Sequence, residues 1–445
     1  MSLTLLGILG CIVLLSLLGL SMPVGFALAV VGCGGYALAI GDLAGAGHLL
    51  LSSCYETFSK YDLSVIPLFI FMGQITYHAG ISRRLYDAAY HWLSWLPGGL
   101  AMATVGACTA FGAICGSGPA TAATMSAVAL PEMRRRGYDM KLASGTVAAG
   151  GSLGMLIPPS VVFIVYGIMT KVSPAKLFMS GVLPGLLITV LFCFYIGIAC
   201  HINPTLGPAG EPTTMAAKFK SLLGIIETII LFTIVMGGMF LGWFTPTEAA
   251  AIGAGAGVIV ALCRGALTWN ILRKAFLETM RTSCMVLIII AGASMFGRFL
   301  GVTNLPSTLA RTLAEAQMPQ AVTLSVIILG FIIASCFIDA LALVMLTIPI
   351  LLPVVQKFTF GGGGEQTMIW FGTLIVLVTQ IGVITPPPVG VNVYVVGGIA
   401  RDIPLQKIFR GAMPFFLLIV IAMLFLIFFP QLALWLPHLM QKLAA

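Results

Sequence analysis

Two apolar stretches of the chain carry nearly the same interrupted motif, and this repeat restricts the possible folds more than any other feature. Residues 153–161 read LGMLIPPSV and residues 381–389 read IGVITPPPV. Matching positions elsewhere stay 222–230 residues apart, so each half of the chain is expected to be one structural unit. A Gly/Pro break at corresponding places in two hydrophobic halves is typical of secondary transporters, which bind their substrate at the breaks.

Composition indicates a membrane protein. Apolar residues make up 59% of the sequence and charged residues 8%, whereas soluble domains carry roughly 25% charged residues. Many apolar runs approach or exceed the roughly 18–20 residues with which a helix crosses a bilayer. The first run, residues 5–20, lacks the basic flank and cleavage site of a signal peptide, so we expect it to remain as a membrane helix. The predicted fold class is an all-α polytopic membrane protein.

Each half is expected to contain full membrane helices, one pair of shorter helices and one broken helix. The short pairs meet at residues 116–119 (GSGP) and near Asp339. Because Pro and Gly disfavour one continuous helix in the first of them, we predict that each pair is a re-entrant hairpin. The expected first half comprises helices at 3–20, 23–41, 64–80 and 177–200, a hairpin at 97–131 and a broken helix at 141–171. The expected second half comprises helices at 221–243, 246–263, 282–300 and 405–429, a hairpin at 319–355, a broken helix at 366–399 and a C-terminal tail at 431–445.

The distribution of basic residues predicts the orientation. With these elements, 15 Lys and Arg residues fall on one side of the membrane and six on the other. The positive-inside rule makes the richer side cytoplasmic and puts both termini in the periplasm. Each half then crosses five times, an odd number, so the second half is an inverted copy of the first. Segments 81–95 and 305–317 mix charged and apolar residues and are expected to lie along the membrane surface, with ordinary polar loops as the alternative.

The hairpin tips and the breaks expose backbone carbonyls and hydroxyl groups at membrane depth. Oxygen ligands of this kind suit a small hard cation, so we expect one cation site in each half. The alternative is that the glycines only allow tight helix packing. The expected cation ligands are Ser117, Gly118, Thr121, Gly151, Ser152 and Gly154 in the first half, and Asp339, Thr379, Gln380, Gly382 and Thr385 in the second.

Three charged residues lie in or near predicted spans. Asp339 is expected to serve the cation, to cap the following helix, or both, because a carboxylate at that depth is costly without a role. Arg298 could attract an anionic substrate or could extend its side chain to the outer interface. Glu248 follows Thr245 at the spacing of a capping box. The expected substrate-binding residues, between the two tips and the two breaks, are Ser117, Pro119, Pro158, Pro159, Ser160, Arg298, Pro386, Pro387 and Asn392.

Four strings resemble a known family. They are residues 116–121 (GSGPAT), 153–160 (LGMLIPPS), 244–251 (FTPTEAAA) and 385–390 (TPPPVG). Together they are similar to the large membrane subunit of the TRAP (tripartite ATP-independent periplasmic) transporters, the DctM-like permeases, and the likeness extends over essentially the whole chain.

This resemblance implies more than the residue patterns do. Such permeases import organic acids with sodium ions, using a separate small four-helix membrane subunit and a periplasmic binding protein in the bacterial inner membrane. Their fold resembles that of elevator-type transporters. The division implied for this chain is a scaffold of residues 1–96 and 201–318, a transport domain of residues 97–200 and 319–430, and the tail at 431–445.

Other functions fit the sequence less well. A stand-alone proton- or sodium-coupled anion carrier, or an antiporter of the same architecture, is the main alternative. The sequence has no H-E-x-x-H motif, nucleophile elbow or P-loop, which disfavours an intramembrane enzyme or an ATP-driven pump. The ten cysteines are scattered singly and are expected to pack as small apolar residues. No nucleic-acid partner is expected, because the net charge of +8 follows from the orientation bias. No cofactor besides the coupling ion is expected.

Overall fold

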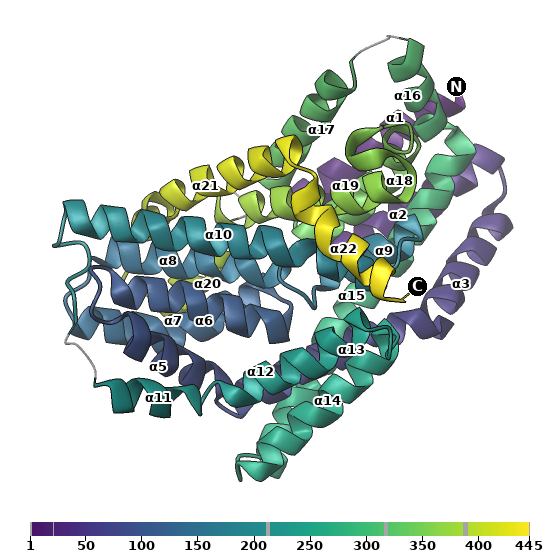
Figure 1. Ribbon diagram of the computed structural model, residues 1–445. Coiled ribbons are helices and arrows are strands. Elements are labelled where there is room, and N and C mark those ends of the chain that lie inside the picture. Colours follow the sequence, from purple (N-terminus) through teal and green to yellow (C-terminus); the bar gives the residue numbers. More distant parts are fainter. Residues whose placement is uncertain (1, 21, 211–213, 316–318, 386–389, 445) are drawn as a thin grey trace.

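The structure, a computed structural model, describes residues 2–20, 22–210, 214–315, 319–385 and 390–444, and every regular element in those ranges is a helix (Figure 1). Within this part of the chain six helices are long and apolar enough to cross a membrane. A seventh candidate bends by 65° between residues 61–78 and 81–93. The predicted all-α polytopic membrane fold is therefore confirmed. Five crossings in each half, and the inversion of the second half, remain predictions.

The N-terminal region contains one helix that the sequence did not predict. Its helices are α1 (Leu3–Gly19), α2 (Val24–Ile40), α3 (Leu43–Ser59), α4 (Val65–His78) and α5 (Ile81–Leu93). The unpredicted helix is α3, which lies against α2 and α15 at one edge of the molecule (Figure 1). The carboxylate of Asp42 caps it by accepting a 2.8 Å hydrogen bond from the backbone N–H of Ala44. Hydropathy missed α3 because polar residues interrupt its apolar pattern.

The same order of elements occurs once in each half. In the first half, α6 (Gly99–Cys115) and α7 (Gly118–Arg135) form a helical pair, α8 (Met140–Ser152) and α9 (Val161–Thr170) form a broken helix, and α10 (Pro174–Ile202) follows. In the second half the corresponding elements are α17 (Gln320–Ser335), α18 (Ala340–Val355), α19 (Gly364–Ile384), α20 (Val391–Ile399) and α21 (Leu405–Phe428). The interruptions lie where the sequence predicted them. That the two pairs are re-entrant stays a prediction.

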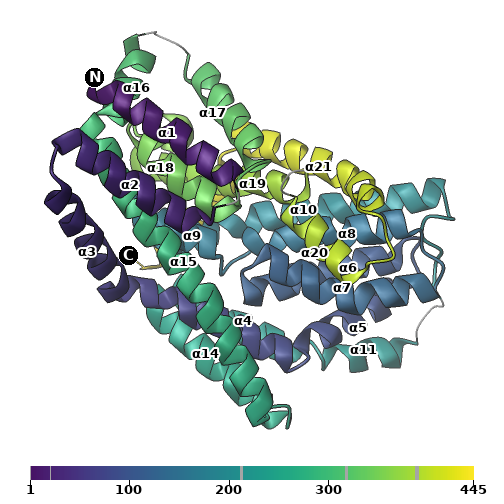
Figure 2. The ribbon, with the colours of Figure 1, turned by 180° about the vertical axis from the view of Figure 1, so that it is seen from behind.

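The region between these repeats contains the longest helix, α15. The elements are α11 (Met215–Leu222), α12 (Ile226–Phe232), a π-helical stretch (Thr233–Gly237), α13 (Gly238–Phe240), α14 (Pro246–Cys263), α15 (Trp269–Thr303) and α16 (Leu305–Glu315). The predicted start of α15 at residue 282 was wrong, because Thr268 caps the helix 14 residues earlier. Its first turns project from the body of the molecule (Figure 2). Glu248 and Thr245 form the predicted capping box at the start of α14.

Small residues let distant helices touch along their backbones. Where α2 crosses α15, a Cβ on Gly32 would lie 2.6 Å from the backbone nitrogen of Phe296, and a Cβ on Gly292 would lie 2.3 Å from the carbonyl oxygen of Gly25. Side chains larger than hydrogen would push these helices apart. The N-terminal helices are thereby held against α15 (Figure 2).

The contact between α8 and α21 combines backbone packing with an ion pair. A Cβ on Gly145 would lie 2.2 Å from the carbonyl carbon of Gly411. At the start of α8, Oδ1 of Asp139 lies 3.2 Å from Nζ of Lys407. Burial alone would raise the pKa of Asp139, but the backbone N–H of Lys141 and the ammonium of Lys407 lower it below its usual value.

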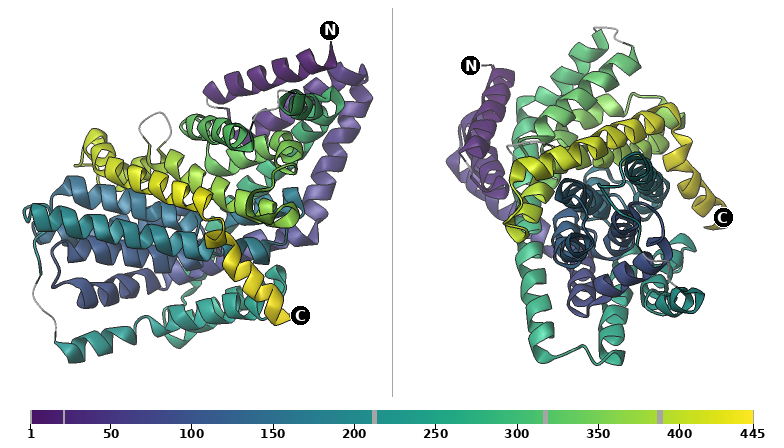
Figure 3. Two further views of the ribbon diagram at one scale, coloured as in Figure 1. Left: turned by 45° about the horizontal axis from the view of Figure 1, so that its top comes forward. Right: turned by 90° about the vertical axis from the view of Figure 1, so that its left-hand side faces the viewer.

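The C-terminal segment is a helix and not a tail. Residues of α22 (Gln431–Ala444) turn away from the end of α21 and pack against α10 (Figure 3). Ala433 and Leu434 in the first turn of α22 are fully buried. The expected C-terminal tail at 431–445 is thus a packed helix over Gln431–Ala444, because apolar side chains in its first turn find a partner surface that is distant in the sequence.

Candidate functional site

The first hairpin tip packs against the first broken helix. Gly116 ends α6 with a left-handed φ of 62°, and extended Ser117 caps α7 by accepting a hydrogen bond from the N–H of Ala120 at 3.5 Å. A Cβ on Gly116 would lie 2.3 Å from the carbonyl oxygen of Pro159. Pro158, Pro159 and Ser160 are all buried. The tip therefore needs glycine here, both for its turn and for its contact with the break.

The predicted first-half cation ligands converge at this contact. The hydroxyl of Thr121 donates a 2.8 Å hydrogen bond to the carbonyl oxygen of Ser117. A Cβ on Gly154 would lie 2.7 Å from that hydroxyl oxygen and 3.0 Å from that carbonyl oxygen. A Cβ on Gly118 would lie 3.4 Å from the carbonyl oxygen of Gly151. Next along the chain, fully buried Ser152 donates a hydrogen bond to Ala149 within α8.

Asp339 occupies the corresponding position at the second tip. Its carboxylate accepts a 3.1 Å hydrogen bond from the N–H of Leu341 and caps α18, as the sequence predicted. Its side chain is exposed rather than packed away. The two tips thus present a hydroxyl and a carboxylate at the start of their second helices.

The second hairpin also packs closely on its broken helix. A Cβ on Gly382 would lie 2.2 Å from the carbonyl oxygen of Ser335. The hydroxyls of Thr379 and Thr385 donate to helix carbonyls, at 2.8 Å for Val376 and 3.1 Å for Gly382. The predicted substrate residues Pro386 and Pro387 lie outside the described residues.

Two buried amides beside the breaks have unused hydrogen-bonding atoms. Gln380 on α19 is fully buried, and neither its Nε2 nor its Oε1 has a hydrogen-bond partner among the described residues. Asn392 on α20 is fully buried as well. Its Nδ2 donates a 2.9 Å hydrogen bond to the carbonyl oxygen of Ala148 on α8, whereas its Oδ1 has no partner among the described residues. A Cβ on Gly151 would lie 3.0 Å from that Nδ2, which places Asn392 beside the first-half cluster.

A cavity of about 930 Å³ has both tips in its wall. The opposite wall comes from α2, α4 and α15. Most of the lining is apolar, as in many small-molecule sites, with a few polar groups converging on the space. The charged or polar side chains among the described residues that line it are Gln74, Tyr77, Ser117, Thr124, Glu278, Arg281, Thr282 and Asp339.

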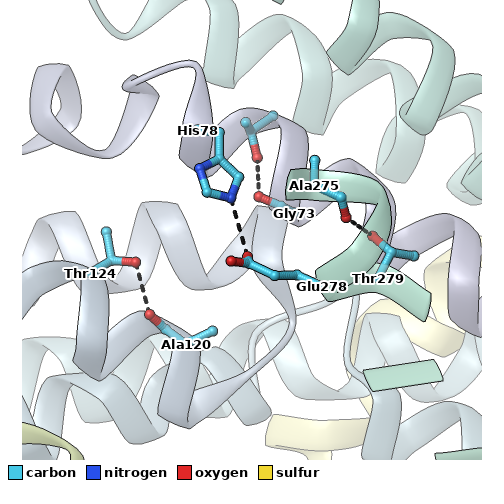
Figure 4. A network of polar contacts seen from close by, with 8 residues as sticks. Gly73, His78, Ala120, Thr124, Ala275, Glu278 and Thr279 are labelled. Atoms are coloured by element: carbon cyan, nitrogen blue, oxygen red, sulfur yellow. Dashed lines mark hydrogen bonds and ion pairs between the residues drawn. The ribbon is translucent and has the colours of Figure 1, made fainter. Parts of the chain in front are cut away.

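The α15 wall contributes charges that the sequence did not single out. Nε2 of His78 lies 3.1 Å from Oε2 of Glu278, and Figure 4 shows this pair opposite the α7 segment that carries Thr124. Arg281 lines the cavity one turn further along α15. These residues were missed because residues 264–281 were taken as a loop. The capping Thr268 followed by a helical run was the available signal.

Arg298 is not brought to the cavity. Its guanidinium Nη2 lies 2.6 Å from Oε2 of Glu56 on α3, and both side chains are partly exposed. Arg298 is absent from the described lining of the cavity. The ion pair satisfies the charge of Arg298 near the end of α15. Of the other predicted substrate residues that the structure describes, Ser117 and Pro119 line the cavity, whereas the lining does not include the buried Pro158, Pro159, Ser160 and Asn392.

A bundle of apolar helices with two interrupted hairpins that meet in one cavity defines a membrane transport protein. The overall fold is similar to that of the YdaH transporter of Alcanivorax borkumensis, with a TM-score of 0.60 and 16% identity over 98% of this chain and 99% of that one. At this identity the likeness shows the fold alone.

The chain belongs to the family described as "Tripartite ATP-independent periplasmic transporter, DctM component", which matches residues 11–432. It is 33% identical over 391 residues to the C4-dicarboxylate TRAP transporter large permease protein DctM of Pseudomonas aeruginosa, covering 86% of this chain and 88% of that protein. It is 30% identical over 434 residues to the sialic acid TRAP transporter large permease protein SiaM of Vibrio cholerae, covering 96% and 97%. These relatives are transport permeases, so the chain is a transport protein and not an enzyme.

Proposed function

We propose that the chain is the large membrane subunit of a sodium-driven importer of an organic acid, with the substrate bound in the cavity between the hairpin tips. The observation that carries this proposal is that Ser117 and Asp339, one residue from each tip, line the same cavity. The N-terminus of α7 starts at Ser117, and a helix N-terminus favours an anionic group, whereas at α18 the carboxylate of Asp339 already occupies that position. The named substrates of the two relatives, a C4-dicarboxylate and sialic acid, both carry carboxylates.

Sodium coupling is supported by the chemistry beside the cavity. Leaving a buried polar group unpaired costs about 1–3 kcal/mol, so the free oxygens of Gln380 and Asn392 favour a bound partner. A hard cation takes carbonyl, amide and hydroxyl oxygens as ligands. We place one sodium site at the Ser117–Gly154 cluster, with Oδ1 of Asn392 nearby. A second site lies at the corresponding segment Thr379–Thr385, which contains Gln380.

We propose an elevator movement for transport. Residues 97–200 and 319–430 form the moving domain, and residues 1–96 and 201–318 form the scaffold. The cavity supports this division because its two walls come from these two groups of helices. Sodium bound near the tips stabilises the arrangement that binds substrate. Coupling follows because sodium has a higher affinity for this arrangement than for the other one.

The remaining parts of the proposal concern location and partners. Two halves of opposite orientation would cross the inner membrane with both termini in the periplasm. A separate small membrane subunit and a periplasmic binding protein would complete the transporter, in keeping with the tripartite family to which the chain belongs.

Reconstitution tests the proposal directly. The purified chain is placed in liposomes with its small subunit, the binding protein is added outside, and uptake of radiolabelled succinate or sialic acid is measured. Uptake is expected only with all three proteins and an inward sodium gradient. Equal uptake by the chain alone would support the stand-alone carrier instead, and uptake driven by a proton gradient without sodium would contradict sodium coupling.

A further inference from the structure

A second cavity, of about 270 Å³, lies between α5 and α11 and shares no lining residue with the cavity described above. On α5, Arg84, Asp87 and His91 lie along one face of an amphipathic helix, and α11 contributes Lys220 from the opposite side of the pocket. The described lining consists of Arg84, Asp87, Ala88, His91, Ala217, Lys220, Ser221 and Gly224. We refer to it as the α5–α11 pocket.

Basic side chains dominate the α5–α11 pocket. Nη1 of Arg84 lies 3.1 Å from Oε2 of Glu227, which also binds Arg264. This pairing holds the Arg84 guanidinium at the pocket wall. Lys220 is exposed and forms no ion pair among the described residues. Asp87 is the acidic residue in the wall.

The surroundings indicate that the α5–α11 pocket lies at the depth of lipid headgroups. The apolar segment Met215–Phe240, which is long enough to cross a membrane, passes through the pocket wall at Gly224. Trp92 and Phe219 pack edge to face, with ring centroids 6.2 Å apart, and both are exposed. Trp residues concentrate at the membrane–water interface. Leu223 adds exposed apolar surface beside the pocket.

We propose that the α5–α11 pocket binds the phosphodiester headgroup of an anionic phospholipid. Arg84 and Lys220 contact the phosphate oxygens, and the lipid chains lie along the apolar surface of Phe219 and Leu223. Basic pockets on the cytoplasmic side of membrane helices recognise such headgroups. A free phosphate would contact the side chains of Arg84 and Lys220 but not the apolar surface. Because α5 packs on α6, a bound lipid would brace the base of the first hairpin against α11.

Thermal unfolding of the full chain in detergent tests this inference. The probes are phosphatidylglycerol, phosphatidylcholine and inorganic phosphate, added to the wild-type protein and to the Lys220→Gln and Arg84→Gln variants. Lys274→Gln is the matched control, because Lys274 is an exposed basic residue on α15 outside the pocket. Phosphatidylglycerol is expected to raise the unfolding temperature of the wild type and of the control. Lys220→Gln should need about fivefold more of this lipid for the same effect, since each basic contact contributes about 1 kcal/mol at an anionic surface.

Three outcomes would overturn the inference. The first is that phosphatidylcholine raises the unfolding temperature as much as phosphatidylglycerol does. The second is that inorganic phosphate does so, which would indicate a simple anion site. The third is that Lys220→Gln responds to phosphatidylglycerol as the wild type does. The Lys220 variant is the decisive one because Arg84→Gln also breaks the pair with Glu227 and can lower stability without any lipid.

Discussion

Asn392 on α20 donates a 2.9 Å hydrogen bond from its Nδ2 to the carbonyl oxygen of Ala148 on α8, and so joins the broken helix of the second half to that of the first. The other amide atom, Oδ1, is buried without a partner among the described residues. The same side chain therefore connects the two halves and leaves one oxygen free beside the first-half cluster.

Replacing Asn392 by Leu tests the role of that oxygen. The variant keeps the side-chain volume but loses both the hydrogen bond, worth about 1 kcal/mol, and the free oxygen. We expect the protein to fold and the sodium concentration for half-maximal uptake to rise at least about tenfold, which corresponds to about 1.4 kcal/mol of cation binding. Thr373→Val is the control, because it removes a buried hydroxyl on α19 that hydrogen-bonds to Ser180 on α10. An unchanged sodium dependence in Asn392→Leu would remove Asn392 from the site.

Asp339 combines a structural and a chemical role, and two substitutions separate them. Asn also caps helices well, so Asp339→Asn should retain the thermal stability of the wild type, whereas Asp339→Ala should lose about 1 kcal/mol. If the carboxylate acts in the cavity, both variants should lose most sodium-driven uptake. Asp42→Asn at the cap of α3 should change neither property. Wild-type uptake by Asp339→Asn would leave the residue with a capping role alone.

Gly382 tests the packing of the second hairpin on its broken helix. Gly382→Ala places a Cβ 2.2 Å from the carbonyl oxygen of Ser335, so the hairpin must shift. Uptake should fall by at least about tenfold, because small displacements of binding groups are costly. Gly330→Ala on α17 is the matched control, since nothing lies within 4 Å of its Cβ position. Equal uptake by the two variants would show that close packing at Gly382 is unnecessary.

Sidedness can be measured at two exposed loops. Arg135 ends α7 at the loop after the first hairpin, Lys357 lies in the loop after α18, and both are exposed. In the inverted arrangement, cysteines introduced by Arg135→Cys and Lys357→Cys should react with a membrane-impermeant maleimide from opposite sides. The parent chain, with its ten native cysteines, sets the background. Labelling of both from the same side would contradict the inversion.

The sequence revealed the parts of the site that depend on local chemistry. The Gly-Ser-Gly-Pro tip, the break at Pro158-Pro159 and the capping role of Asp339 were all predictable, because proline, glycine and capping side chains act on their own backbone neighbours. The same reasoning failed for α3 and for the first turns of α15, where polar residues on a helix resemble a loop. Glu278 and Arg281 were missed for that reason.

By itself the sequence determined that this chain is a helical membrane protein with two similar halves, because its long apolar runs and their interruptions depend on the bilayer and on local backbone preferences. Only the tertiary structure decided which side chains share a cavity. It brought Ser117 and Asp339 together across 222 positions of the chain, paired Arg298 with Glu56, and turned the C-terminal segment into a packed helix. The physical reason is that such contacts depend on how helices pack against one another, and no local pattern records which helices become neighbours.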